Sequence, residues 1–215
     1  MSRAVARSGV FFSLAAAASV ALLALIAPAR ADDMARNAER FIAELAERAS
    51  TILSDEAASP AERRDRFRDM FRESFDVPEV ARFVLGRYWR RAKPEEREEY
   101  LLLFEALVVG TWAPRFAVYH RDRFEIVGAH AVDGENLARV SSEFSFPDSD
   151  PIRIDWWVEG ASNTYRIVDI VVEGISMRVT HRSEFASVIR THGGRLEGLL
   201  ESLRKKTAQF DADLQ

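Results

Sequence analysis

The chain of 215 residues contains no cysteine. This absence excludes disulfide bonds, metal sites with cysteine ligands and lipid attachment through a thiol. Stability must therefore come from a packed hydrophobic core. The material for a core is present, because 47% of the residues are hydrophobic and phenylalanine alone supplies 14 of them.

No apolar run beyond the N-terminal segment is long enough to cross a bilayer. In that segment two arginines precede an alanine-rich run over residues 10–27, and Ala-Arg-Ala at 29–31 forms a small-x-small processing site. The run approaches the roughly 18 to 20 residues that span a membrane, so a retained anchor is the alternative. The weakly hydrophobic alanines and the processing site favour a cleaved secretory signal at residues 1–31.

The chain also lacks an excess of basic residues. Its formal net charge is −4, and removal of the three arginines of the signal leaves 27 basic against 34 acidic residues, a net charge of −7. Nucleic acid is not an expected partner at that charge. The length predicts a single domain over residues 32–207, followed by a polar tail at 208–215.

The first half of the mature chain has a helical hydrophobic period. Apolar residues recur at three- and four-residue steps, and three helices open with a proline in the first turn, at Pro60, Pro78 and Pro94. Pro114 is expected to bend or break the last of these helices. The predicted helices cover residues 37–53, 60–75, 78–88 and 94–116.

The period then changes to alternation. Four antiparallel strands are predicted, over residues 124–126, 140–146, 152–158 and 165–172, with a bulge or sharp bend at Gly174. Helices return over residues 182–192 and 196–203. The order of helices, four strands and helices indicates an α+β fold, with helices packed on one side of an antiparallel sheet.

Catalytic and metal-binding motifs are missing. None of the four histidines, His120, His130, His181 and His192, belongs to a His-Glu-x-x-His pair, and they are interpreted as surface or capping residues. The sequence also has no Gly-x-Ser-x-Gly elbow and no glycine-rich phosphate loop. Ser176 is interpreted as structural, and Asp169 as a strand carboxylate that pairs with an arginine or faces solvent. A binding role is favoured over an enzyme, with no catalytic residue and no metal site.

Two stretches carry a family resemblance. They are FDVPEVARFVLGRYW at residues 75–89, which continues into the helix start at 93–97, and IVDIVVEGIS at 167–176, followed by RSEF at 182–185. Together they resemble the MlaC family, also called the toluene-tolerance auxiliary family, of soluble periplasmic lipid carriers in Gram-negative bacteria. The similarity in order and spacing runs from about Phe41 to Leu203.

The resemblance implies a twisted four-stranded antiparallel sheet wrapped by helices, with an apolar cavity between them that holds acyl chains as cargo and needs no cofactor. A cavity of this kind accounts for the abundance of large apolar residues and the scarcity of motifs. The residues predicted to line its wall are Leu85, Trp89, Phe104, Val108, Trp112, Phe144, Trp156, Ile170 and Met177.

The resemblance also implies partners in the periplasm. These are an inner-membrane ABC transporter with a periplasmic lipid-binding ring, and an outer-membrane lipoprotein complex. On that basis Arg82, Arg87, Arg90 and Arg91 form a candidate docking or headgroup-facing patch, although charges on a helix more often only face solvent.

Three alternatives stay open at the level of sequence. The cargo could be a hopanoid, a rigid pentacyclic lipid, because a branch of the same family is associated with hopanoids. The protein could be a small periplasmic hydrolase or isomerase with Asp169 as base. It could also be a periplasmic scaffold whose aromatic surface binds protein and holds no lipid.

Overall fold

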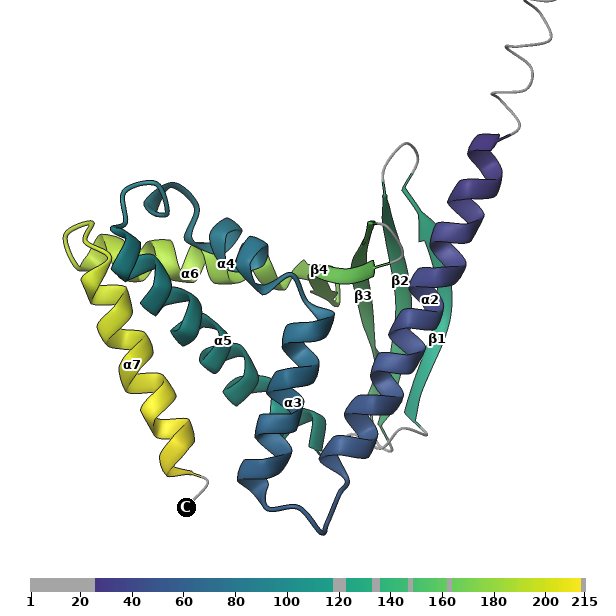
Figure 1. Ribbon diagram of the computed structural model, residues 1–215, viewed down its shortest axis with the longest axis horizontal. Helices are drawn as coiled ribbons and strands as arrows, with labels where there is room; N and C mark the ends of the chain where they lie inside the picture. The colour runs from purple at the N-terminus through teal and green to yellow at the C-terminus, as the bar shows by residue number, and fades with distance from the viewer. Residues whose placement is uncertain (1–25, 118–122, 133–135, 147–148, 162–163, 214–215) are drawn as a thin grey trace, which may run out of the picture.

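The computed structural model describes residues 26–117, 123–132, 136–146, 149–161 and 164–213. The first described helix lies with the sheet on one side of the molecule, and the other helices lie on the other side (Figure 1). The elements are α2 (Ile26–Leu53), α3 (Pro60–Ser74), α4 (Val77–Leu85), the 3-10 turn η1 (Gly86–Tyr88), α5 (Pro94–Ala117), β1 (Phe124–Ala131), β2 (Leu137–Phe146), β3 (Ser149–Ala161), β4 (Thr164–Val172), β5 (Ile175–Ser176), α6 (Met177–Thr191) and α7 (Glu197–Ala212).

The sheet is an antiparallel meander in the order β1-β2-β3-β4-β5. Helix α2 lies along β1 and β2 and covers one face of the sheet (Figure 1). This arrangement confirms the α+β class. The sheet has five strands among the described residues rather than the predicted four, because a two-residue strand is too short to show alternation.

The extra strand follows a tight turn. Glu173 and Gly174 both have positive φ, 48° and 78°, so the chain reverses within two residues. Positive φ at both central positions is typical of the hairpin turn that matches the twist of the strands. Val171 then pairs with Ser176, which places β5 beside β4. The predicted bend at Gly174 is confirmed, and it is the turn of a hairpin.

The predicted helix starts are confirmed at Pro60 and Pro94, and α4 starts one residue before Pro78. Ser59 caps α3 through a full capping box, in which its hydroxyl accepts from the Glu62 N–H and the Glu62 carboxylate accepts from the Ser59 N–H. The Ser59 N–H and the Ser59 hydroxyl both donate to the Glu62 carboxylate and lower its pKa. The first helix begins at Ile26, earlier than predicted, and so includes the predicted processing site.

Helix α5 is not broken at Pro114, which removes one backbone hydrogen bond in the last turn, and it ends at Ala117, one residue after the predicted end. Two other helices differ from the sequence predictions. Helix α6 begins at Met177 instead of residue 182, because Ser176 caps it. Helix α7 runs to Ala212, so residues 208–212 are helical and do not form a tail.

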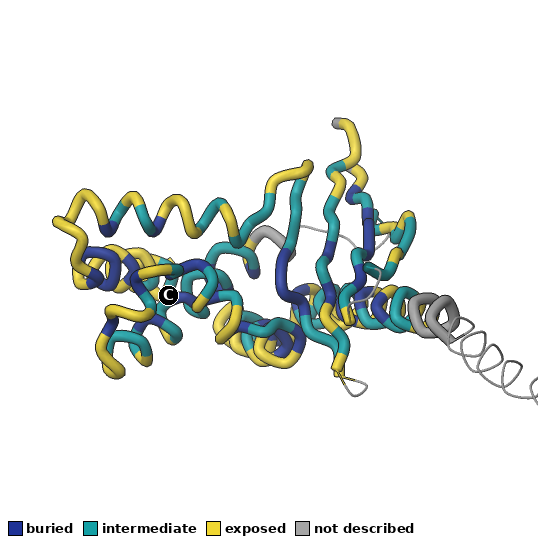
Figure 2. The backbone as a smooth tube through the Cα atoms, turned by 90° about the horizontal axis from the view of Figure 1, so that it is seen from above, coloured by how far each residue is buried: buried dark blue, intermediate teal, exposed yellow. Residues whose placement is uncertain are grey.

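The buried residues form a core that extends from the helices to the sheet (Figure 2). On the helical side Phe185 packs edge to face against both Phe104 and the fully buried Tyr100. A parallel bridge from Phe75 to Ile167 joins the start of α4 to β4, and the Asp76 N–H donates to the Ile167 carbonyl at 3.1 Å. The helices and the sheet therefore share one hydrophobic interior.

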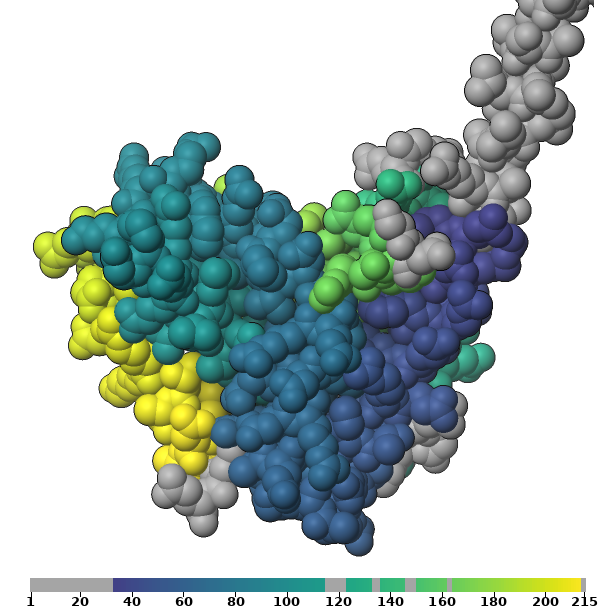
Figure 3. All heavy atoms as spheres, viewed as in Figure 1, coloured from purple at the N-terminus to yellow at the C-terminus, as the bar shows by residue number. Residues whose placement is uncertain are grey.

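Two helix pairs complete the outside. Helix α3 lies against α2 on the face shown in Figure 3, and α7 packs against α5. Arg204 of α7 donates to both carboxylate oxygens of Glu99 on α5, at 2.6 and 2.9 Å, which lowers the pKa of Glu99. None of the helices in the described ranges combines the length and the apolar character that a membrane crossing requires.

Candidate functional site

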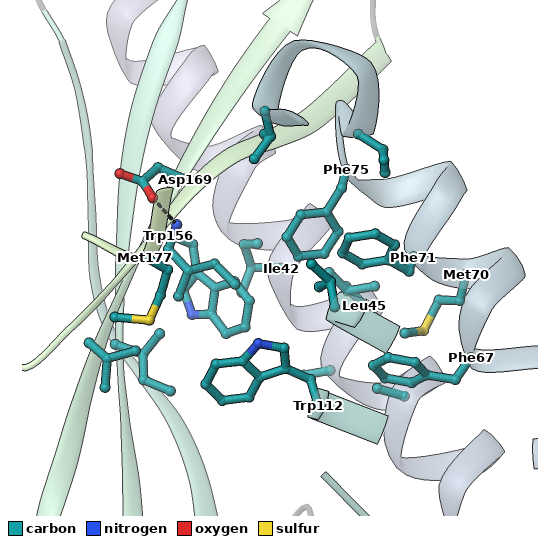
Figure 4. A pocket seen from close by; sticks show the side chains of 18 of the residues that line it. Ile42, Leu45, Phe67, Met70, Phe71, Phe75, Trp112, Trp156, Asp169 and Met177 are labelled. Atoms are coloured by element: carbon teal, nitrogen blue, oxygen red, sulfur yellow. Dashed lines mark hydrogen bonds between the residues drawn. The ribbon is translucent and has the colours of Figure 1, made fainter. Parts of the chain in front are cut away.

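An apolar cavity lies between the sheet and the helices α2, α3 and α5, and the start of α6 borders one end (Figure 4). The volume open to the centre of a water molecule is about 150 Å³. This is roughly ten times what one water needs, and apolar cavities of such a volume stay dry and accept apolar ligands. The lining residues are Ile42, Leu45, Ala46, Ala49, Ser50, Leu53, Phe67, Met70, Phe71, Phe75, Val77, Val80, Phe104, Val108, Trp112, Phe124, Phe144, Ile154, Trp156, Val168, Asp169, Ile170, Val172, Met177, Arg178 and His181.

Helices α2 and α3 supply one wall. Ile42, Leu45 and Ala49 follow one another at three- and four-residue steps, so the apolar stripe of α2 points into the cavity. Helix α3 contributes Phe67, Met70 and Phe71, and the ring centroids of Phe71 and Phe75 are 4.3 Å apart. Figure 4 shows these side chains facing Trp112 and Trp156 across the cavity.

The sheet supplies the opposite wall, centred on Trp156 of β3. The indole N–H of Trp156 donates to the hydroxyl of Ser142 at 2.9 Å, and that hydroxyl donates to the Ile154 carbonyl at 3.2 Å. The polar edge of the ring is thus satisfied within the sheet, and its apolar body is left for the cavity. Phe124 and Phe144, 5.2 Å apart, continue this wall.

A bulge in β4 reorients the strand beside the cavity. Ile167 pairs with Val158 and Asp169 with Trp157, so Val168 is the extra residue. Ile167, Val168 and Asp169 are consequently all buried. The simple alternation expected from the sequence, with Val168 and Asp169 on opposite faces, is wrong here, since both line the cavity.

The polar lining groups gather at the junction of β4 and α6. Asp169 is 7% exposed and accepts hydrogen bonds from the Ser176 hydroxyl at 2.6 Å and from the N–H groups of Ile170 and Arg178 at 2.8 and 3.2 Å. The Arg178 Nε lies 3.3 Å from the same carboxylate. Asp169 therefore anchors the start of α6, and the predicted pairing with an arginine is found.

Seven of the nine predicted wall residues lie around this one cavity: Phe104, Val108, Trp112, Phe144, Trp156, Ile170 and Met177. Leu85 and Trp89 do not line it. Leu85 is buried in the common core on α4, which packs on α5 and α6. Trp89 stands edge-on to Tyr100 and carries the guanidinium of Arg97 on its face. Both follow the helical period, but the period cannot tell a cavity wall from core.

The wall residues of α2 and α3 were not predicted from the sequence. The apolar stripes of both helices were visible, including Ile42, Leu45 and Met70, but nothing in a stripe tells which element it will face. Phe75, at the end of α3, is the clearest omission, because it begins the first family motif. Only the tertiary structure brings these side chains opposite Trp156.

The predicted arginine patch lies outside the cavity. Arg82, Arg87, Arg90 and Arg91 are all exposed, near the C-terminal end of α4 and the turn that follows. Arg82 lies 3.9 Å from Glu79, and Arg87 stacks over the ring of its neighbour Tyr88. Their placement is compatible with a docking surface and not with a cavity wall.

The histidines occupy the surface positions expected of them, with one exception. His192 caps the end of α6, where its Nδ1 lies 2.8 Å from the Val188 carbonyl, and His130 is exposed on β1. His120 lies outside the described residues. His181 lines the cavity and lies 3.0 Å from Glu184. Across the part of the chain that the structure describes, no cluster of histidine and carboxylate groups could hold a metal ion.

The comparison with protein families gives one decisive match. The model of the family described as MlaC protein matches residues 39–205, which extend from within α2 into α7. The chain belongs to the MlaC family. The resemblance seen in the two sequence motifs is thereby confirmed.

A solved structure is similar to this chain in fold. It is the phospholipid-binding protein from Ralstonia solanacearum, determined in complex with a phospholipid. The superposition has a TM-score of 0.69 and covers 80% of this chain and 98% of that one, at 22% sequence identity. At this identity the likeness concerns the fold, so it supports the arrangement of sheet and helices around the cavity.

Proposed function

We propose that this MlaC protein is an exported lipid carrier that holds the acyl chains of one phospholipid in the cavity and leaves the headgroup at its mouth. The observation that carries the proposal is the cavity itself. Of the 26 lining residues in the described ranges, only Ser50, Asp169, Arg178 and His181 bear a hydroxyl, carboxylate, guanidinium or imidazole group. Membership of the family and the phospholipid bound to the structural neighbour support the choice of cargo.

The energetics fit a carrier without bond chemistry. Each methylene moved from water into an apolar cavity contributes about 0.8 kcal/mol, so two acyl chains offset the cost of leaving a membrane. The carrier can then equilibrate its cargo with donor and acceptor proteins according to their relative affinities. The site needs no cofactor for this, and the lipid is its only cargo.

Location and partners follow from the same proposal. The signal at residues 1–31 would direct the protein to the periplasm, where it would shuttle phospholipid between an inner-membrane ABC transporter with its lipid-binding ring and an outer-membrane lipoprotein complex. The exposed Arg82, Arg87, Arg90 and Arg91 form the proposed docking patch. Reversal of Arg87 and Arg90 to glutamate should weaken binding to the ring without changing the melting temperature; unchanged affinity would remove the patch from the proposal.

An enzymatic role for Asp169 has less support. A general base needs a free lone pair that faces the substrate, whereas both oxygens of this carboxylate accept hydrogen bonds from Ser176, Ile170 and Arg178. Asp169→Asn is expected to weaken the cap of α6 and to lower stability. A hydrolase would instead lose turnover with its stability intact.

The test is the composition of the protein as purified. The chain is expressed with its own signal in a Gram-negative host, purified without detergent, and analysed by native mass spectrometry and lipid extraction. One phospholipid per protein is the expected result, together with an N-terminus at Asp32. A hopanoid, recovered only from a host that makes it, would replace phospholipid as cargo, whereas a folded protein without lipid would favour the scaffold.

A further inference from the structure

We propose that Arg178 is the phosphate-binding residue of the carrier, at the rim of the cavity where β4 meets α6; this inference rests on the proposed function. Arg178 is the one basic side chain besides His181 among the described lining residues. It is the second residue of α6, directly after the cavity-lining Met177 (Figure 4). A phospholipid with its chains in the cavity would bring its phosphodiester to this end.

The guanidinium is fixed in place, yet only partly used. Its Cζ lies 4.6 Å from the ring centroid of Phe83, and its buried Nε faces Asp169 at 3.3 Å without the geometry of a hydrogen bond. Within the described ranges no group hydrogen-bonds to its terminal nitrogens, and the side chain is 36% exposed. The fork of terminal N–H groups, which matches the oxygens of a phosphate, is therefore open to a ligand.

Asp169 does not cancel this site. Its carboxylate already accepts from the Ser176 hydroxyl and two backbone N–H groups, which share its charge with Arg178. Glu184, on the following turn of α6, pairs with His181.

Arg182 provides a matched control. It sits one helical turn after Arg178 and stacks on the same ring, but it does not line the cavity. Its guanidinium lies instead against Gly86 at the end of α4, in the outer groove with Val179 and Arg190. Replacement of either arginine by glutamine removes one positive charge and one cation contact with Phe83. A difference in lipid affinity between the two variants therefore reports on the position of Arg178 in the cavity wall.

The experiment compares two ligands with equal chains. Delipidated protein is titrated with dioctanoyl phosphatidylglycerol and with dioctanoylglycerol, which lacks the phosphate. Binding is followed by tryptophan emission, to which Trp112 and Trp156 in the cavity wall contribute. Arg178→Gln should weaken the phospholipid roughly tenfold or more, as expected for charge-assisted hydrogen bonds, and leave dioctanoylglycerol unchanged. Arg182→Gln should change neither affinity more than about twofold. If Arg178→Gln does not fold, Arg178→Lys is measured instead, since it keeps the charge but loses the paired terminal N–H groups. It should also weaken binding of the phospholipid alone, by a smaller factor.

Each other outcome has a distinct meaning. Equal losses for both ligands, or no loss for either, would overturn the assignment and leave Arg178 as a wall or solvent residue. Saturable binding of inorganic phosphate alone, as strong as that of the phospholipid, would overturn the lipid headgroup as the source of the phosphate. A wild-type protein that binds neither ligand would contradict the proposed function itself.

Discussion

The indole N–H of Trp156 reaches the hydroxyl of Ser142 on the neighbouring strand at 2.9 Å, and Ser142 is fully buried. This pair lets a tryptophan form the wall of an apolar cavity without an unsatisfied donor. Position 142 lies in the core of the sheet, but it must carry a hydrogen-bond acceptor for Trp156.

Ser142→Ala should lower the free energy of unfolding by about 1 to 3 kcal/mol, because the Trp156 N–H is left without an acceptor in the interior. Urea unfolding followed by circular dichroism measures the change. Trp156→Phe in the same background removes the orphaned donor, so the double variant should lose less than the two single variants together. Additive losses would show that the hydrogen bond contributes nothing.

A charge on the cavity wall should abolish lipid retention. Val108→Glu would place a carboxylate among apolar side chains, where it must either remain solvated or exclude the acyl chain. Native mass spectrometry of the purified variant should find little or no lipid. Leu102→Glu is the control, because Leu102 lies on the same helix and is 66% exposed; equal lipid occupancy in both variants would place the acyl chains elsewhere.

Stability should fall above pH 10 through Tyr100. This side chain is fully buried and its hydroxyl donates to the Ala81 carbonyl at 2.9 Å. Burial raises the pKa of Tyr100 well above 10. In the unfolded chain the phenol loses its proton near pH 10, so above that pH the unfolded state is favoured by up to about 1.4 kcal/mol per pH unit.

The comparison is with Tyr100→Phe, measured by urea unfolding between pH 8 and pH 11. At pH 8 the variant should be less stable by about 1 kcal/mol, because it lacks the hydrogen bond to Ala81. Above pH 10 the gap should close, since phenylalanine cannot ionise. A gap that stays constant across this range would mean that Tyr100 does not titrate with unfolding.

The contact of Phe210 with Gly110 should decide whether Gly110→Ala stabilises or destabilises the protein. A Cβ at Gly110 would clash with the Phe210 ring, so Gly110→Ala must displace the end of α7. Overpacking of this kind costs about 1 to 3 kcal/mol. In a Phe210→Ala background the same change should instead stabilise by up to about 1 kcal/mol, because alanine favours a helix. Destabilisation in both backgrounds would contradict this explanation.

The sequence by itself determined which elements form and where several of them begin. The capping signal at Ser59 and the prolines at helix starts depend on atoms within one turn, so they can be read from adjacent residues. The alternation of β2 and β3 gave the class of fold and the orientation of Trp156 toward the helices, and the two family motifs gave the family.

The tertiary structure alone decided which apolar residues enclose a cavity. Leu85 and Phe104 both follow a helical period and are both buried, yet only Phe104 lines the cavity. The bulge at Val168 turns Asp169 inward, and the cap at Ser176 starts α6 early enough to bring Arg178 to the rim. A local sequence pattern predicts that an apolar side chain is buried, because the free-energy cost of exposing it to water depends on the residue itself. What the side chain meets there depends on elements far away along the chain, which no local period contains.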